Sequence, residues 1–181
     1  MKILDNTYMG IIKIRQITDK DRFEVYNLIK TAFETADVKG GDEQDYAEEL
    51  REGKNYIPQL DLVAEKDGKI VGQVMFTETY ISGLDGKMTK ALLLSPISVL
   101  LEYRCQGIGA ALIHEGFRLA GEIGYKSVFL CGDPAYYQRF GFKRTTAYGI
   151  RHALGYPEEN VMCRELEEGV LNGIRGTVDI C

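Results

Sequence analysis

The order of hydrophobic and polar positions divides the chain into short segments that alternate and longer segments with helical spacing. The alternating segments predict strands over residues 12–15, 60–65, 70–81, 91–101, 127–130, 148–152 and 161–165. Helical spacing and helix-start residues predict helices over residues 19–33, 43–51, 108–123 and, in a short form, from residue 134. Strands and helices are therefore interleaved, which predicts a mixed α/β fold.

Two of these helices show which side they bury. We expect the first helix to bury Phe23, Tyr26, Leu28, Ile29 and Phe33. We expect the helix after residue 107 to bury Ile108, Leu112, Leu119 and Ile123, and to end at Gly124. These apolar stripes are the predicted contribution of the helices to the core.

The chain has 181 residues, of which 45% are hydrophobic, and a formal net charge of −5. This length suits one domain, and no proline- or serine-rich linker divides it. We therefore expect a single domain over residues 9–181, preceded by a loose extension over residues 1–8. The negative charge argues against nucleic acid as a partner. No segment approaches the roughly 20 apolar residues that a membrane helix needs.

Four cysteines stand at positions 105, 131, 163 and 181, and the chain has two histidines. No Cys-x-x-Cys pair occurs, so we expect no zinc or other metal site. Scattered cysteines without a secretion signal predict four reduced thiols in a cytoplasmic protein.

The most informative segment is the turn Arg104-Cys-Gln-Gly107-Ile-Gly109, which joins the central strand to the next helix. Glycines let the backbone adopt conformations that a side chain forbids, so several N–H groups can point outward together. Such a nest at a helix N-terminus binds anions, and the turn can therefore hold a pyrophosphate. Glycine pairs before a helix also serve tight turns and close packing, and the turn alone does not decide between the two roles.

Two other phosphate-binding motifs do not fit this turn. A Rossmann site would need a third glycine near position 112, where Leu112 stands, and a first strand near the start of a βαβ unit. A Walker loop would need a following Gly-Lys-Ser/Thr, which is not in the sequence.

Pro96 is an irregularity inside the predicted central strand. Proline removes a ladder hydrogen bond and is tolerated mainly at bulges and edges. Hydrophobic residues on both sides favour the sheet interior, and hence a bulge, with an edge position as the alternative.

The turn and its flanking strand and helix, over residues 92–123, resemble motif A of the GCN5-related N-acetyltransferases, the GNAT family. A strand and a short helix follow in the family's order, and Tyr137-Gln-Arg-Phe-Gly141-Phe142 matches the family's Tyr-x-x-x-Gly-Phe motif. The chain as a whole is similar to the YhbS-like branch of that family. The resemblance implies a GNAT-type fold, with a mostly antiparallel central sheet, a splayed strand pair and flanking helices. It also implies that a bulge at Pro96 helps to splay the pair.

The resemblance implies direct transfer of an acetyl group from acetyl-CoA to a primary amine of a small molecule or a peptide. The pyrophosphate of coenzyme A would bind the backbone N–H groups of Cys105, Gln106, Gly107, Ile108, Gly109 and Ala110. The pantetheine arm would pair with the strand edge at Ile97, Ser98 and Val99, where an N–H group would stabilise the oxyanion. The Arg104 side chain would add positive charge, or else lie in solvent at the strand end.

Tyr137 stands four residues before Gly141, at the family's tyrosine position, and is our candidate for the general acid that protonates the leaving thiolate. A phenol with an ordinary pKa of about 10 is protonated at neutral pH. The alternative is that Tyr137 only packs under the cofactor. Tyr136 lies one helical step away, about 100° around the helix, and is less suited. Asp133 stands where the family commonly has asparagine, and capping of the short helix is its expected role.

The sequence does not assign the general base. The candidates are Glu78, Ser95, Glu102 and His152, and a water relay would relax the geometry. The family's acceptor wall comes largely from the first two helices and their loop, where this chain has Glu34, Asp37, Asp42, Glu43, Asp45, Glu48 and Glu49. An acidic wall would favour a cationic amine, whereas a solvated helix face is the plainer interpretation.

A regulatory module that binds acyl-CoA without catalysis is the alternative function. Both functions predict cofactor binding, and the presence of Tyr137 favours the enzyme. The acceptor, the acyl group and the existence of a homodimer stay open at this stage.

Overall fold

The computed structural model describes residues 12–35, 40–153 and 155–180. Its strands are β1 (Lys13–Gln16), β2 (Tyr56–Lys66), β3 (Lys69–Gly83), β4 (Met88–Val99), β5 (Ser127–Cys131), β6 (Lys143–Arg144), β7 (Ile150–His152), β8 (Val161–Glu165) and β9 (Gly176–Val178). Its helices are α1 (Arg22–Glu34), α2 (Glu43–Glu52), α3 (Ile108–Glu122) and α4 (Pro134–Tyr137). The extension predicted over residues 1–8 lies outside the described residues.

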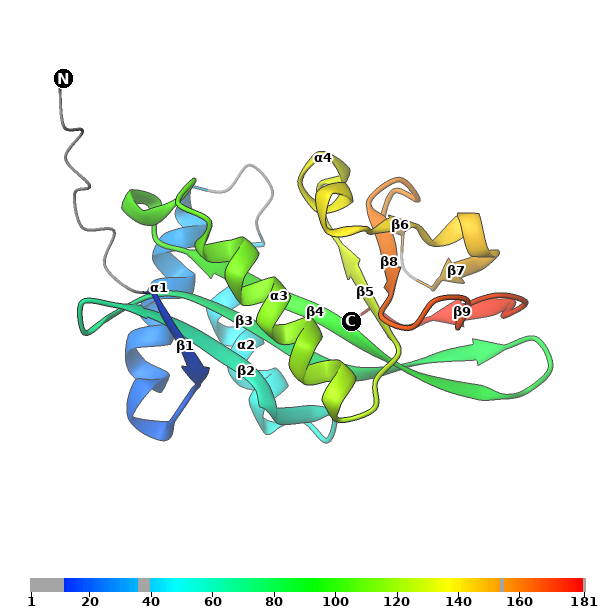
Figure 1. Ribbon diagram of the computed structural model, residues 1–181, viewed down its shortest axis with the longest axis horizontal. Coiled ribbons are helices and arrows are strands. Elements are labelled where there is room, and N and C mark those ends of the chain that lie inside the picture. Colours follow the sequence, from blue (N-terminus) through cyan, green and yellow to red (C-terminus); the bar gives the residue numbers. More distant parts are fainter. Residues whose placement is uncertain (1–11, 36–39, 154, 181) are drawn as a thin grey trace, which may run out of the picture.

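The described strands form one sheet in the order β1-β2-β3-β4-β5-β8-β6, and β9 pairs with both β3 and β7. Only the β4–β5 and β7–β9 pairs are parallel among these strands. Helix α3 covers one face of the sheet, and α1 with α2 covers the other (Figure 1). The predicted mixed α/β fold with a mostly antiparallel sheet is confirmed. No helix in the described part of the chain is long and apolar enough to span a membrane.

Helix α1 buries a regular stripe formed by Val25, Leu28, Ile29 and Ala32. Leu28 and Ile29 were predicted to be buried, but Phe23 is 80% exposed, so that prediction is wrong. Phe23 precedes Val25 by two residues, or about 200° around the helix, and therefore points away from the sheet. Aromatic character alone does not show which side of a helix is buried.

Helix α3 buries Ile108, Leu112, Ile113, Gly116, Phe117 and Ala120. Ile108 and Leu112 follow the prediction, whereas Ile123 is 45% exposed and was wrongly assigned to the stripe. Ile123 is the residue after the helix, next to Gly124 with φ of +92°, and so lies where the chain already turns away.

Gly116 of α3 packs directly against the ring of Phe76 on β3. A methyl group there would overlap the ring of Phe76, which is fully buried. We expect Gly116→Ala to lower the free energy of unfolding by about 1–3 kcal/mol in urea titrations, because the core is overpacked. Gly121 on the same helix has no neighbouring atom within 4 Å, so Gly121→Ala should instead stabilise by up to about 1 kcal/mol. Equal effects of the two variants would rule out this packing argument.

Strand β4 carries the predicted bulge. Val74 of β3 pairs with Ile97, and Phe76 pairs with Leu94, so Met75 alone lies opposite two residues, Ser95 and Pro96. This register shift confirms the bulge, and Pro96 is buried. Because β5 pairs with β4 only at Leu92 and Leu93, Pro96 also lies on an unpaired edge of β4. The strand ends at Val99 rather than at the predicted residue 101, because residues 101–103 form a 3₁₀ turn.

Strands β4 and β5 separate soon after they meet. Their parallel register consists of Leu92 with Val128 and Leu93 with Phe129. Beyond these pairs β5 leads away towards α4, as Figure 1 shows. The part of β4 after Leu93 is therefore left with an edge facing the gap, as predicted for the splayed pair.

The C-terminal strands were predicted only in part. Strand β8 has the predicted bounds, and β7 begins at residue 150 rather than 148. Strands β6 and β9, with two and three residues, were not predicted. Segments this short cannot show alternation, and their pairing with β8, β3 and β7 defines them instead.

Candidate active site

The turn between β4 and α3 has two residues in the left-handed region. Cys105 has φ of +59°, and Gly107, the N-cap of α3, has φ of +81° and ψ of 0°. Left-handed residues alternating with ordinary ones turn successive N–H groups towards the same side, which makes a nest for an anion. A non-glycine residue at positive φ, such as Cys105, is strained and is typical of functional turns. The geometry supports the predicted pyrophosphate site.

Gly109 makes room for a tyrosine. A Cβ atom at Gly109 would lie 2.7 Å from the hydroxyl of Tyr136. The second glycine of the motif therefore lets α4 approach the first turn of α3, and Tyr136 reaches the predicted cofactor turn. This position of Tyr136 was not predicted, since Tyr136 was considered only as a general acid. The sequence signal for this contact was the pair Tyr136-Tyr137 together with Gly109, a glycine that allows another side chain to come close to the backbone.

The ring of Tyr137 lies beside that of Tyr136. The Tyr137 ring also lies over Gly132, the residue that follows β5, so that a methyl group at Gly132 would overlap it. The ring makes edge contacts with Tyr136 at 4.9 Å and Phe142 at 5.8 Å between centroids. Burial raises the pKa of the Tyr137 phenol, which keeps it protonated at neutral pH. The hydroxyl-bearing ring therefore stands where β5 has left β4.

Asp133 caps α4 as predicted. Its Oδ1 atom accepts a hydrogen bond of 2.9 Å from the N–H of Ala135, and Pro134 occupies the first turn. This cap fixes the start of the short helix that carries both tyrosines.

Arg104 is not a solvated side chain. Its Nε donates to the carbonyl oxygen of Val99 at 3.1 Å, and its Nη2 donates to that of Ala32 at 2.7 Å. The side chain thus ties the end of α1 to the end of β4. Any contact of Arg104 with the cofactor stays a prediction.

The side chain of Gln73 on β3 forms hydrogen bonds to the bulge in β4, and we call these bonds the Gln73 brace. Its Nε2 atom lies 3.3 Å from both the Pro96 carbonyl oxygen and the Ser98 hydroxyl. Gln73 is fully buried, and its Oε1 atom has no partner among the described residues. The brace holds the backbone of Ile97, Ser98 and Val99, and nothing in the sequence pattern pointed to Gln73.

The arrangement of turn, splayed strands and α4 agrees with comparisons to known proteins. The model of the acetyltransferase (GNAT) domain matches residues 13–145. The chain belongs to the GNAT acetyltransferase family. It is an acetyl-CoA-dependent N-acetyltransferase, as the resemblance predicted.

Three relatives illustrate the similarity. The N-acetyltransferase YhbS of Escherichia coli K12 is 34% identical over 121 residues, which are 66% of this chain and 71% of YhbS. The crystal structure of E. coli YhbS in complex with CoA has a TM-score of 0.84 and 29% identity, covering 95% of this chain and 91% of that one. A GNAT acetyltransferase of Brucella melitensis in complex with acetyl-CoA has a TM-score of 0.75 and 28% identity, covering 93% and 95%.

The four candidates for the general base lie in different parts of the acetyltransferase, and Glu78 is the first of them. Glu78 accepts hydrogen bonds from Lys90 at 2.8 Å, from Tyr125 at 2.5 Å and from Tyr80. Burial alone would raise the pKa of Glu78, but these donors outweigh it and lower the pKa to about 2. Glu78 also lies opposite Leu92, where β4 and β5 are still paired. It is therefore a weak base on the wrong side of the gap.

The other three candidates lie in different surroundings. Ser95 is at the bulge, and Glu102 is exposed and pairs with Lys69 at 3.4 Å. His152 is half-buried, and its Nδ1 atom has no hydrogen-bond partner among the described residues. The candidates for the general base are therefore these three side chains and a water relay.

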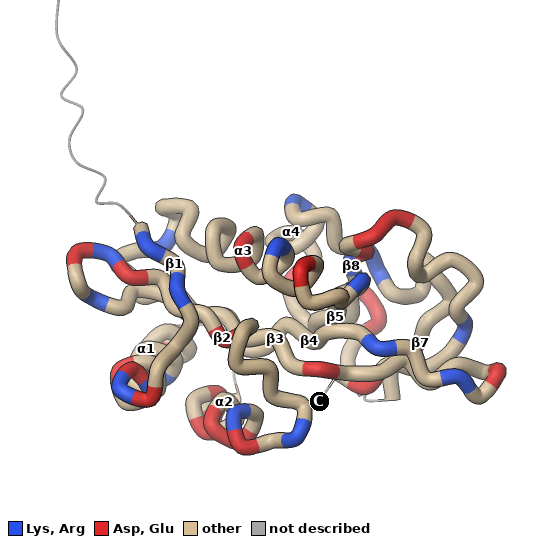
Figure 2. The backbone as a smooth tube through the Cα atoms, turned by 60° about the horizontal axis from the view of Figure 1, so that its bottom comes forward, with Lys and Arg blue, Asp and Glu red and all other residues tan. Residues whose placement is uncertain are grey.

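Several acidic residues of the predicted acceptor wall are already paired. Glu48 accepts from Arg22 and Arg51, each at 2.5 Å, and Asp45 accepts from Tyr26 at 2.8 Å. Figure 2 shows acidic residues along α2, and Asp37 lies outside the described residues. The carboxylates of Asp45 and Glu48 thus join α2 to α1.

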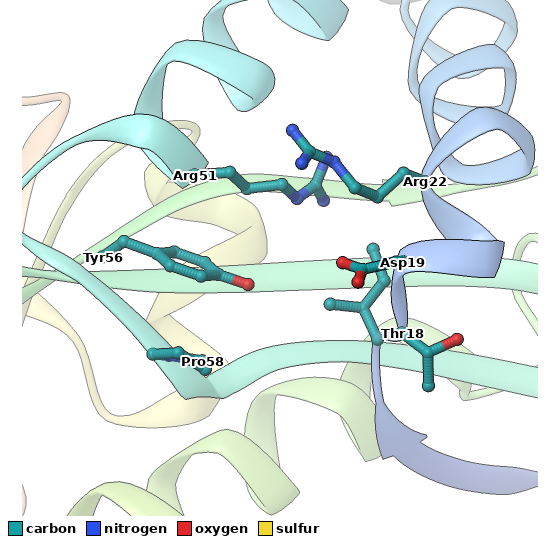
Figure 3. Close-up of a pocket in the computed structure, with 7 residues that line it drawn as sticks. Thr18, Asp19, Arg22, Arg51, Tyr56 and Pro58 are labelled. Atoms are coloured by element: carbon teal, nitrogen blue, oxygen red, sulfur yellow. The ribbon is translucent and has the colours of Figure 1, made fainter.

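A pocket with a volume of about 420 Å³ lies between the start of α1, the end of α2 and the start of β2 (Figure 3). It is lined by Ile17, Thr18, Asp19, Arg22, Arg51, Tyr56 and Pro58. Arg51 pairs with buried Asp61 at 2.8 Å, and the Tyr56 hydroxyl donates to the same carboxylate at 3.1 Å. Burial, and then Asp61, raises the pKa of Tyr56 to about 12. Tyr56 of β2 pairs with Thr77 of β3, so β3 separates this part of the pocket from β4.

Proposed function

We propose that the turn over residues 104–110 and the exposed edge of β4 bind acetyl-CoA, and that Tyr137 is the general acid of acetyl transfer. One observation carries the proposal. The left-handed residues Cys105 and Gly107 follow the part of β4 that β5 leaves unpaired, with one 3₁₀ turn over residues 101–103 between them. A pyrophosphate site and an open strand edge are thus joined in one segment. The relatives with bound CoA and acetyl-CoA support the same ligand for this chain.

The cofactor would extend from the turn along β4. Its pyrophosphate would accept hydrogen bonds from the N–H groups of residues 105–110, aided by the α3 dipole. Its pantetheine amides would pair with the backbone of Ile97, Ser98 and Val99, which the Gln73 brace holds in place. The thioester would then lie in the gap, below the ring of Tyr137.

The reaction would proceed by direct attack of a neutral primary amine on the thioester carbonyl carbon. A backbone N–H group of β4 would donate to the oxyanion that forms. When the carbon–sulfur bond breaks, the sulfur takes the electron pair and accepts the proton of Tyr137. The amine loses a proton to a base or to a water relay, which then restores the phenol proton through solvent.

The acceptor is proposed to be a small molecule or a peptide with a primary amine. The exposed carboxylate of Glu49 keeps a cationic amine among the candidates, although its neighbours Asp45 and Glu48 are paired. Cys105 and Cys163 are free thiols, which supports the cytoplasm as the proposed location. We also propose that the protein forms a homodimer, and a measurement of its molar mass in solution tests this.

Release of free thiol from acetyl-CoA across a panel of amines tests the function. We expect at least one amine to raise thiol release well above the hydrolysis seen without amine, and mass spectrometry to find that amine heavier by one acetyl group. Polyamines, amino acids, aminoglycosides and short peptides make a suitable panel. Tight CoA binding with no acetylated product from any amine would favour the non-catalytic acyl-CoA-binding module instead.

A further inference from the structure

Arg139 holds a fixed position beside the cofactor turn. Its guanidinium carbon lies 4.1 Å from the centroid of the Tyr136 ring, and its Nε donates to the Tyr136 carbonyl oxygen at 2.9 Å. Two contacts with one residue restrict the side chain, although it is exposed. A guanidinium stacked on an aromatic ring keeps its outer N–H groups free for a planar anion.

Tyr136 connects this cation to the turn. The hydroxyl of Tyr136 lies against Gly109 at the start of α3, while the ring carries Arg139. The positive charge of Arg139 therefore stands one phenol ring away from the nest over residues 105–110. In contrast to Arg15, Arg22, Arg51 and Arg118, Arg139 forms no ion pair with a carboxylate in the part of the chain that the structure describes.

The other basic side chains near the turn are engaged. On the hairpin between β2 and β3, Lys66 donates to the Gln106 side chain at 3.1 Å, and Lys69 pairs with Glu102 at 3.4 Å. Both ammonium groups also lie over the Tyr103 ring, at 5.7 and 5.4 Å from its centroid. Arg139 is thus the better placed cation for a second anionic group of a ligand whose pyrophosphate occupies the turn.

We propose that Arg139, held on the ring of Tyr136, binds the 3′-phosphate of the adenosine in coenzyme A. This inference rests on the proposed cofactor site. A phosphate monoester offers two oxygens to the guanidinium fork, and such charge-assisted pairs are stronger than neutral hydrogen bonds. Arg139 then makes the acetyltransferase select coenzyme A over its 3′-dephospho form, which has the same pyrophosphate, pantetheine arm and thiol.

Calorimetry with coenzyme A and 3′-dephospho-CoA tests the subsite in the full chain. We expect the parent to bind coenzyme A about 10-fold to 100-fold more tightly, the range for hydrogen bonds between charged groups. Arg139→Met should lose this preference because its affinity for coenzyme A falls to that for 3′-dephospho-CoA, which itself is unchanged. Arg151→Met, an exposed arginine on β7, is the matched control and should keep the full preference.

The outcomes separate this subsite from the cofactor site itself. A parent that binds both ligands equally well overturns the 3′-phosphate subsite and leaves the cofactor turn intact, whereas a parent that binds neither overturns the cofactor turn as well. Equal weakening of both ligands by Arg139→Met would assign Arg139 to the pyrophosphate or to the fold. Loss of the preference in Lys66→Met, with Arg139→Met unaffected, would move the phosphate to the β2–β3 hairpin.

Discussion

Gly107→Val is expected to abolish binding of coenzyme A while the protein stays folded. Gly107 has φ of +81° and ψ of 0°, and no atom lies within 4 Å of the place where a Cβ would be. A side chain at position 107 is therefore unfavourable because of the backbone conformation and not because of a lack of space. A β-branched residue in the left-handed region costs at least about 1–2 kcal/mol, which the exposed turn can relieve by rotating its N–H groups away from the nest.

Calorimetry with coenzyme A measures the effect, and urea unfolding checks the fold. Gly107→Asn is the matched control, because asparagine tolerates the left-handed region better than other side chains. We expect Gly107→Asn to keep measurable binding and Gly107→Val to lose it, with both variants unfolding cooperatively. An unchanged affinity in Gly107→Val would remove the turn as the pyrophosphate site.

The sequence predicted the parts of the site that depend on backbone conformation. The two glycines of the turn, the bulge at Pro96 and the cap at Asp133 each follow from a local rule about φ, a missing N–H or a helix N-terminus. Such rules need only neighbouring residues. The predicted order of strands and helices is local in the same way, and it was confirmed except for the shortest strands.

The missed features depend on contacts between distant segments. Gln73 is 23 residues from Pro96, and Arg104 is 72 residues from Ala32. Neither separation has a signature in a single sequence, because an arginine or glutamine is ordinarily exposed. The exposure of Phe23 also depends on distant contacts. The sheet surface against which α1 packs determines that the side with Val25 is buried and the side with Phe23 is exposed.

Tyr137→Phe is expected to lower kcat by about 10²–10⁴-fold, the usual contribution of general acid catalysis. The phenol lies over Gly132 at the open side of β5, and burial raises its pKa, so it carries its proton at the pH of the reaction. It donates that proton only as the thiolate departs. Its loss should therefore reduce turnover and leave acetyl-CoA affinity unchanged.

Pre-steady-state mixing with the amine that the panel identifies isolates the chemical step from product release. Tyr148→Phe is the matched control, because it removes a hydroxyl that donates a hydrogen bond to Glu165 at 3.5 Å, on strand β8. We expect the control to react as fast as the parent. If Tyr137→Phe also reacts at the parental rate, Tyr137 is a packing residue between Tyr136 and Phe142, and the proton for the sulfur comes from solvent in the gap between β4 and β5.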